Sequence, residues 1–202
     1  MRKTVLTTMT AVVLFLSAAA AQAASSTEQI VFFRHGEKPS GGYGQLTCQG
    51  FNRAIALHDV LVPKFGTPDY LFAPNPAPKM TDSAGSFYYI RPIATIEPMA
   101  IRLGLPVNAH YGYTDITSLT TAITGSGYAG STVFVAWEHS YLVKAVQAIL
   151  NKYKAGITAP AWTTGDYDSL YIVTLTTTNG YTTATFKREY EGLNNQPTTC
   201  PN

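Results

Sequence analysis

Two segments of the chain are apolar without alternation, which is typical of strands buried on both faces of a parallel sheet. Residues 29–33 form the first and end at an Arg-His-Gly triplet, residues 34–36. Residues 132–137 form the second and end at a Glu-His pair, residues 138–139. Helical spacing of apolar positions follows each run, over residues 54–61 and 141–153. The pattern therefore predicts two strand–helix units, each with a histidine at its junction.

The region between these units carries shorter signals. Residues 69–73 are apolar and precede a proline-rich loop, and residues 106–109 predict a further short strand. A helix is predicted over residues 91–103, because a proline at its second position costs little there. Pro98 lies inside this helix and should kink or split it. A short helix is predicted over residues 118–123.

The C-terminal part predicts a hairpin. Residues 170–176 and 181–186 are strand-like, and an Asn-Gly pair at residues 179–180 is a strong turn signal between them. We therefore predict an α/β fold: a three-layer sandwich with a mostly parallel central sheet flanked by helices, and a C-terminal antiparallel edge hairpin. Ligands of such sheets bind beyond the carboxyl ends of the strands, so His35 and His139 are expected to converge on one site.

Residues 1–23 have the pattern of a signal peptide. Two basic residues precede an apolar run over residues 11–16, and Ala-Gln-Ala follows at residues 21–23. The run is too short to span a bilayer, which takes about 20 residues, and the ending fits cleavage before Ala24. We therefore expect a mature domain over residues 24–202 that is periplasmic or secreted and has no stable membrane insertion.

The charge of the mature chain argues against one class of partner, and its two cysteines permit a disulfide. The chain has 14 Lys and Arg against 12 Asp and Glu, and loss of the leader removes two basic residues, which leaves the mature chain formally neutral. It offers no basic face of the kind that nucleic-acid binding requires. Cys48 and Cys200 are an even count in an exported chain and permit a disulfide, but the sequence alone does not show that they meet.

Five landmarks occur in a characteristic order along the mature chain. The first is the end of the first strand with its Arg-His-Gly-Glu motif (residues 31–39), and the second is Leu-Thr-x-x-Gly-x-x-Arg at the next helix (residues 46–54). Arg91 begins a later helix, and Arg-Leu-Gly-Leu-Pro ends it (residues 102–106). The last is Glu-His after the later strand (residues 138–139). This set resembles the histidine phosphatase superfamily, also called phosphoglycerate mutase-like. The resemblance implies a pocket that transfers a phosphoryl group.

The resemblance also implies a role for each pocket residue. His35 would be the nucleophile and form a phosphohistidine that water hydrolyses, without a metal ion or organic cofactor. Arg34 and Arg91 would bind phosphate through planar, permanently charged guanidinium groups, and His139 would donate to the phosphoryl oxygens. The arginine charges would disfavour protonation of His35 and leave one ring nitrogen free to attack.

The proton for the leaving alcohol has more than one candidate source. Glu138 adjoins His139, and Asp115 lies in the region where many small family members carry their acid. Glu37, in the loop of the nucleophile, is a third candidate and would otherwise help to shape the substrate site. A metal site of His35, Glu37, Glu138 and His139 is chemically conceivable, but no ligand motif such as His-Glu-x-x-His supports it.

We therefore expect an exported, metal-independent phosphomonoester hydrolase that acts on a phosphorylated small molecule or an envelope-associated phosphoester. A phosphatase is favoured over a phosphoglycerate-type mutase, because the sugar phosphates of glycolysis are cytosolic. The short mature chain leaves little room for a large cap, so the site is expected to be open. The alternatives are such a mutase, or a non-catalytic phosphate-ester-binding protein with the same fold.

Overall fold

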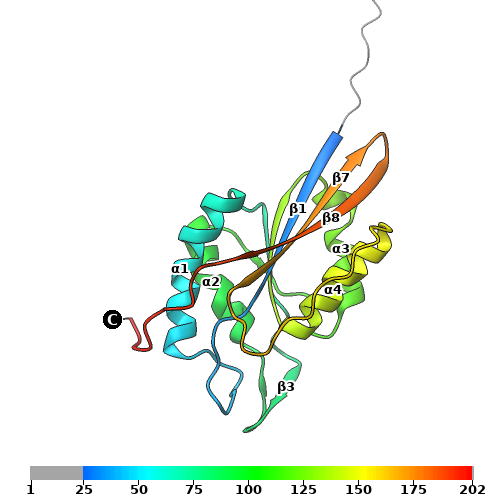
Figure 1. The fold of residues 1–202 in the computed structure, drawn as a ribbon. Helices are drawn as coiled ribbons and strands as arrows, with labels where there is room; N and C mark the ends of the chain where they lie inside the picture. Colours follow the sequence, from blue (N-terminus) through cyan, green and yellow to red (C-terminus); the bar gives the residue numbers. More distant parts are fainter. Residues whose placement is uncertain (1–24, 202) are drawn as a thin grey trace, which may run out of the picture.

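The central sheet has six strands in the order β5-β2-β6-β1-β7-β8 (Figure 1). The computed structural model describes residues 25–201, so the expected signal peptide, residues 1–23, lies outside the described residues. The strands of this sheet are β1 (Ser25–Arg34), β2 (Tyr70–Phe72), β5 (Val107–Asn108), β6 (Thr132–Trp137), β7 (Ser169–Thr178) and β8 (Tyr181–Tyr190). The first four of these run parallel, whereas β7 pairs antiparallel with β1 and β8 with β7. The predicted fold class is thus confirmed.

Four helices cover the two faces of the sheet (Figure 1). They are α1 (Cys48–Phe65) and α2 (Arg91–Leu103) on one face, and α3 (Ile116–Ile123) and α4 (His139–Lys152) on the other; a short 3-10 turn, η1 (Ser126–Tyr128), follows α3. The side chains of β1 point alternately to the two faces of the sheet. Ile30 and Phe32 pack with α3 and α4, whereas Val31 and Phe33 pack with α1 and α2. This two-sided burial explains why the strand is apolar without alternation.

The middle strand pair sets the position of the two histidine motifs. Strands β1 and β6 are parallel neighbours, with Arg34 opposite Trp137 at their carboxyl ends. The next residue, His35, continues the ladder by donating its backbone N–H to the Trp137 carbonyl at 3.1 Å. The two motifs therefore leave the sheet side by side, as predicted.

The structure corrects two expectations about the region before α2. Residues 79–88, for which no strand was predicted, form a hairpin of β3 (Lys79–Asp82) and β4 (Gly85–Tyr88) at the end of the sheet where β1 terminates (Figure 1). Helix α2 is not split at Pro98. Pro98 removes one helix hydrogen bond, which costs about 3 kcal/mol of folding free energy. Burial of Ile96 and Met99 beside it contributes about 1.5–3 kcal/mol each and so offsets this cost.

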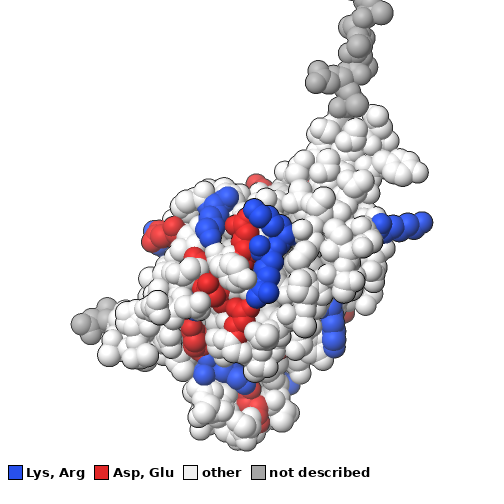
Figure 2. Space-filling model, in the orientation of Figure 1, with Lys and Arg blue, Asp and Glu red and all other residues white. Residues whose placement is uncertain are grey.

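Charged side chains are unevenly distributed over the surface. Figure 2 shows them gathered over the body of the molecule, while the projecting end formed by β7 and β8 is almost bare of charge on this face. Residues 169–186 contain no Lys, Arg, Asp or Glu and are rich in threonine. Within residues 25–201, none of the helices has both the length and the apolar character needed to cross a membrane.

A disulfide ties the C-terminal tail to the start of α1. Cys48 and Cys200 are bonded, with Cα atoms 4.5 Å apart across a sequence separation of 152 residues. Asn52, one turn along α1, donates to the Pro197 and Thr199 carbonyls at 2.8 Å each. The tail is therefore held along the first turns of α1 by covalent and polar contacts together.

Candidate active site

The loop between β1 and α1, which carries His35 and Gly36, packs directly against two helices. The backbone N–H of Gly36 donates to the Thr95 hydroxyl of α2 at 3.0 Å, and the Thr95 hydroxyl donates to the Arg91 carbonyl at 2.8 Å. On the other side the loop touches the first turn of α1, because a Cβ on Gly36 would lie 2.7 Å from the Gly50 carbonyl oxygen. Only glycine fits at this contact, which explains the third residue of the Arg-His-Gly triplet.

The ring of His35 is held in one tautomer. Its Nδ1 lies 2.8 Å from the Gly36 carbonyl oxygen, which can only accept, so Nδ1 carries the hydrogen and Nε2 has the free lone pair of the neutral ring. Burial, to 2% exposure, lowers the pKa of His35 well below its ordinary value, and the charges of Arg34 and Arg91 lower it further. His35 is therefore a neutral imidazole whose Nε2 lone pair is available.

Arg34 ends β1 and is fixed by the loop that precedes β7. Its Nη1 donates to the carbonyls of Thr164 at 2.6 Å and Asp166 at 2.9 Å, and its guanidinium lies 3.9 Å from the centre of the Tyr167 ring. Its Nε is buried and has no hydrogen-bond partner among the described residues. One part of the guanidinium is thus anchored to protein, and another remains free to donate to an anion.

Arg91 is the first residue of α2 and is fixed by the β3–β4 hairpin. Its Nη1 donates to Asp82 Oδ2 at 2.8 Å and to the Gly42 carbonyl at 3.2 Å. Burial alone would raise the pKa of Asp82, but hydrogen bonds from Arg91 and Lys38 outweigh it and lower that pKa. The Nε of Arg91 is buried and, within residues 25–201, unpartnered. The second arginine repeats the arrangement of the first.

His139 begins α4, two residues earlier than the sequence predicts, and Glu138 caps the helix. Glu138 Oε2 accepts from the Tyr141 backbone N–H at 2.9 Å, and its Oε1 lies 2.6 Å from His139 Nδ1. Burial alone would raise the pKa of Glu138, but the His139 ring and the Tyr141 amide outweigh it, and the pKa lies below its ordinary value. Glu138 is therefore an ionised carboxylate that holds His139.

Two other predicted residues face elsewhere. Asp115 is exposed and caps α3, with its Oδ1 accepting from the Ser118 backbone N–H at 3.4 Å. No hydrogen bond or ion pair within residues 25–201 joins the Asp115 side chain to the pocket arginines or histidines. Glu37 turns away from His35, because both its oxygens accept from Arg53, at 2.7 to 3.2 Å.

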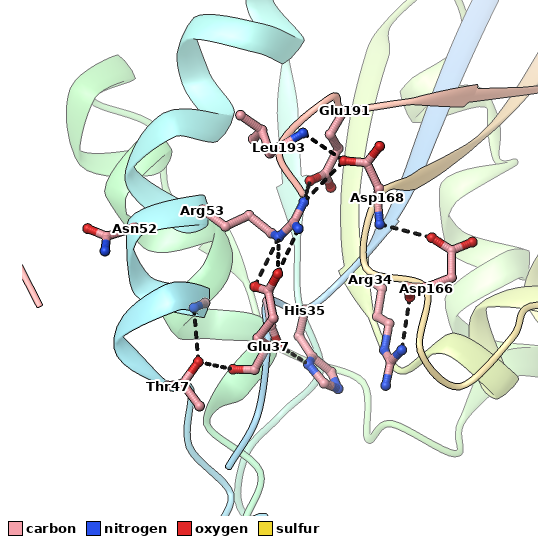
Figure 3. A network of polar contacts seen from close by, with 12 residues as sticks. Arg34, His35, Glu37, Thr47, Asn52, Arg53, Asp166, Asp168, Glu191 and Leu193 are labelled. Carbon is pink, nitrogen blue, oxygen red and sulfur yellow. Dashed lines mark hydrogen bonds and ion pairs between the residues drawn. The ribbon is translucent and has the colours of Figure 1, made fainter. Parts of the chain in front are cut away.

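Arg53 is the centre of a buried polar network behind the nucleophile (Figure 3). Besides Glu37, it binds Glu191 at 2.5 Å and Asp168 at 3.4 Å, although its side chain is fully buried. Burial raises the pKa of Glu191 to about 8, although the charge and hydrogen bond of Arg53 act to lower it. The network links the loop after His35 to the loop that holds Arg34, a connection that the sequence motifs did not reveal.

Most of the side chains beside His35 are buried. Tyr89 is fully buried, Arg34 and Arg91 are each 1% exposed, and the His139 side chain is 19% exposed. Asp82 of the β3–β4 hairpin covers Arg91, and the Tyr167 loop covers Arg34. An open entrance for the substrate stays a prediction.

Metal ligation was an alternative for this region. Residues 25–201 contain no group of three or more His, Cys, Asp or Glu side chains placed to hold a metal ion. Of the four residues considered as ligands, Glu37 is committed to Arg53 and Glu138 caps α4. The donors around His35 are instead guanidinium, imidazole and hydroxyl groups, which suit an anion.

Fold and pocket together define a class of protein: an α/β sandwich whose site lies at the carboxyl ends of two parallel strands and combines two arginines with two histidines. Comparison of sequences adds nothing to this, because no protein-family model and no curated protein matches the chain. Comparison of structures does find neighbours.

The neighbours are phosphatases of low sequence identity. A protein assigned as the phosphohistidine phosphatase SixA from Nakamurella multipartitia matches with a TM-score of 0.50 at 16% identity, covering 83% of this chain and 98% of its own. Mycobacterial glucosyl-3-phosphoglycerate phosphatase, solved with inorganic phosphate, matches with a TM-score of 0.51 at 14% identity, covering 79% and 95%. The chain therefore has the phosphoglycerate mutase-like fold of histidine phosphatases.

Proposed function

We propose that the protein is an exported, metal-independent phosphatase that hydrolyses phosphomonoesters through a phosphohistidine on His35. The observation that carries this proposal is the state of His35: a buried, neutral ring with a hydrogen on Nδ1 and a free Nε2, set between two arginines. The fold shared with known phosphatases supports it. Arginine and histidine donors supply the positive charge that phosphoryl transfer requires, so no metal ion is invoked.

The proposed reaction has two displacements at phosphorus. In the first, Nε2 of His35 attacks, the P–O bond to the ester oxygen breaks, and the departing alkoxide takes a proton to leave as the alcohol. In the second, water attacks the phosphohistidine, the P–N bond breaks, and inorganic phosphate leaves. Arg34 and Arg91 offset the charge on the phosphoryl oxygens, and the Gly36 carbonyl orients the ring throughout.

The proton for the leaving alcohol is assigned to the Glu138–His139 pair rather than to Asp115. His139 lies near enough to His35 for its charge to act on that ring, and it is partly open to solvent. Glu138, with its lowered pKa, serves as the carboxylate that orients His139. Asp115 is occupied as a helix cap on the surface. Glu37 is assigned to positioning the nucleophile loop through Arg53.

Export and substrate class complete the proposal. The leader pattern in residues 1–23 supports export, and so does the Cys48–Cys200 disulfide, because such bonds persist in oxidising compartments. A phosphorylated small molecule or an envelope-associated phosphoester is the proposed substrate. Its phosphate would enter on the partly exposed side of the pocket, near His139 and Tyr167, and the rest of the molecule would stay outside.

The test is release of inorganic phosphate from p-nitrophenyl phosphate in EDTA, with the mature protein and its His35→Ala variant. We expect activity that survives chelation and falls at least about a thousandfold in the variant. Trapping with a radiolabelled monoester and an alkaline quench, which preserves phosphohistidine, should label the wild type only. The matched control is His110→Ala, an exposed histidine in a loop, which should keep full activity.

Two results would contradict the proposal. Equal turnover by wild type and His35→Ala would exclude His35 as nucleophile, and loss of turnover on chelation would require a metal. Binding of inorganic phosphate without turnover of any monoester would instead identify a non-catalytic phosphate-binding protein.

A further inference from the structure

Tyr89 is a buried tyrosine whose hydroxyl has no partner. It lies between β4 and α2, two residues before Arg91, and is fully buried. Its backbone N–H donates to the Pro76 carbonyl at 3.2 Å, which fixes the main chain. Its hydroxyl makes no hydrogen bond of good geometry among residues 25–201, although the Arg91 side chain lies close enough to interact with it. Leaving a hydroxyl unpaired in the interior costs stability, so its presence there calls for a function.

The Tyr89 hydroxyl belongs to the phosphate pocket. The tyrosine ring packs edge to face with the His35 ring, with centroids 5.9 Å apart, and lies 4.8 Å from the Arg91 guanidinium. The charges of Arg91, Glu138 and Arg34 all act on the hydroxyl. Burial raises the pKa of Tyr89 well above its ordinary value, so the hydroxyl keeps its proton and acts as a donor.

Two more buried donors beside His35 are unpartnered, namely the Nε groups of Arg34 and Arg91. A phosphoryl group in transfer presents three non-bridging oxygens, all acceptors, whose charge must be met by fixed donors. Unpartnered donors of Tyr89, Arg34 and Arg91 therefore belong to residues that lie beside the His35 ring or act on it, where a phosphoryl group would present its acceptor oxygens. Nη1 of Arg34 and both Nη groups of Arg91 are held by protein, so the two guanidinium groups are fixed before a ligand binds.

We propose that Tyr89 is a catalytic residue of the proposed phosphatase: its hydroxyl donates a hydrogen bond to a non-bridging phosphoryl oxygen as the group passes between ester and His35. The proposal rests on the proposed function. Tyr89 keeps its proton throughout, so no bond to it forms or breaks, and the leaving group takes its proton elsewhere. The sequence motifs name only arginines and histidines as donors to the phosphoryl group. The Tyr89 hydroxyl adds a donor that these motifs do not reveal.

The experiment compares two fully buried tyrosines. Tyr89→Phe removes the unpaired hydroxyl, and Tyr171→Phe removes a hydroxyl that donates to the Pro160 carbonyl at 3.0 Å. For Tyr89→Phe we expect kcat/KM to fall roughly 10- to 100-fold and inhibition by orthovanadate to weaken by a similar factor, with a melting temperature equal to or above that of wild type. Tyr171→Phe should melt earlier and keep its activity.

Each outcome decides the proposal. Unchanged kcat/KM and vanadate inhibition in folded Tyr89→Phe would overturn it. Should this variant not fold, the Tyr89 ring-carbon NMR signal next to the hydroxyl must shift when inorganic phosphate is added to wild type, and no shift would overturn it as well. If wild type binds phosphate without turnover, weaker binding by Tyr89→Phe would support the donor role while the proposed phosphatase activity fails. Failure of wild type to bind phosphate at all would overturn both.

Discussion

His35 owes its reactivity to one hydrogen bond and to its surroundings. The bond from Nδ1 to the neighbouring Gly36 carbonyl selects the tautomer, and burial among arginines keeps the ring neutral. Neither effect needs a carboxylate partner of the kind that orients histidine in a serine-protease triad. The residue therefore carries the requirements of a nucleophile within its own loop.

The state of His35 can be measured directly. Because its pKa is lowered well below the ordinary value, the ring should remain neutral at pH 6 and gain a proton only as the pH falls further. Nitrogen NMR of the free protein should show Nδ1 protonated and Nε2 unprotonated at pH 6, the signal being identified by its loss in His35→Ala. Replacing one neighbouring charge, in Arg91→Gln, should raise the titration midpoint but leave it below the ordinary value, because burial persists. A His35 midpoint at or above 6.5 in wild type would refute this account.

At the level of elements, the buried hydroxyl of Thr95 joins α2 to the start of the loop that carries His35. Thr95 is fully buried one helical turn after Arg91, and it binds both the Arg91 carbonyl and the Gly36 N–H. The helix that presents an arginine thus also holds the loop that presents the histidine. A shift of α2 would move both groups together and preserve their spacing.

Thr95→Val tests this connection. The variant keeps the shape of the side chain but leaves the Gly36 N–H unpaired, so we expect a loss of about 1–3 kcal/mol in the free energy of unfolding and a clear fall in kcat. The matched control is Thr120→Val, a buried threonine whose hydroxyl bonds only to carbonyls of its own helix, at Ile116 and Thr117. That variant should retain kcat. Denaturant titration and turnover measure the two effects, and equal kcat in both variants would disprove the connection.

The elements differ in how far the sequence predicted them. Strands β1 and β6 were predictable because burial on both faces produces continuous apolar runs, and their shared edge brought His35 and His139 together. The β3–β4 hairpin was missed, since its strands are only four residues long and half exposed. Thr95 and Asp82 were missed for another reason: their roles arise from contacts between elements, which no local pattern encodes.

For the molecule as a whole, the disulfide closes nearly the entire described chain. It joins the start of α1 to the tail beyond β8 and so restricts the unfolded chain over 152 residues. The same tail begins next to Glu191, which belongs to the Arg53 network. Covalent and ionic links therefore hold the C-terminal end against the helix that supports the nucleophile loop.

The double variant Cys48→Ser with Cys200→Ser should lose about 2–5 kcal/mol in the free energy of unfolding, because the reduced unfolded chain gains conformational freedom. Its kcat at temperatures well below unfolding should stay within about threefold of wild type, since neither cysteine contacts the pocket. Reductant should lower the melting temperature of wild type and leave that of the double variant unchanged. Identical melting of wild type before and after complete reduction, verified by thiol titration, would rule out this role.

The pairing of β1 with β6 has a consequence for how such a protein can diversify. The two histidines follow adjacent strands, so their separation is governed by the spacing of neighbouring strands, about 4.8 Å, and by the register of Arg34 with Trp137. The length of the chain between the two histidines, roughly one hundred residues, does not affect this separation. Insertions after β2 or after β5 can therefore lengthen the rim and alter which molecules are admitted while the reacting groups stay in place. Recruitment to a new ester would require changes in loops, and the catalytic geometry would be inherited unchanged.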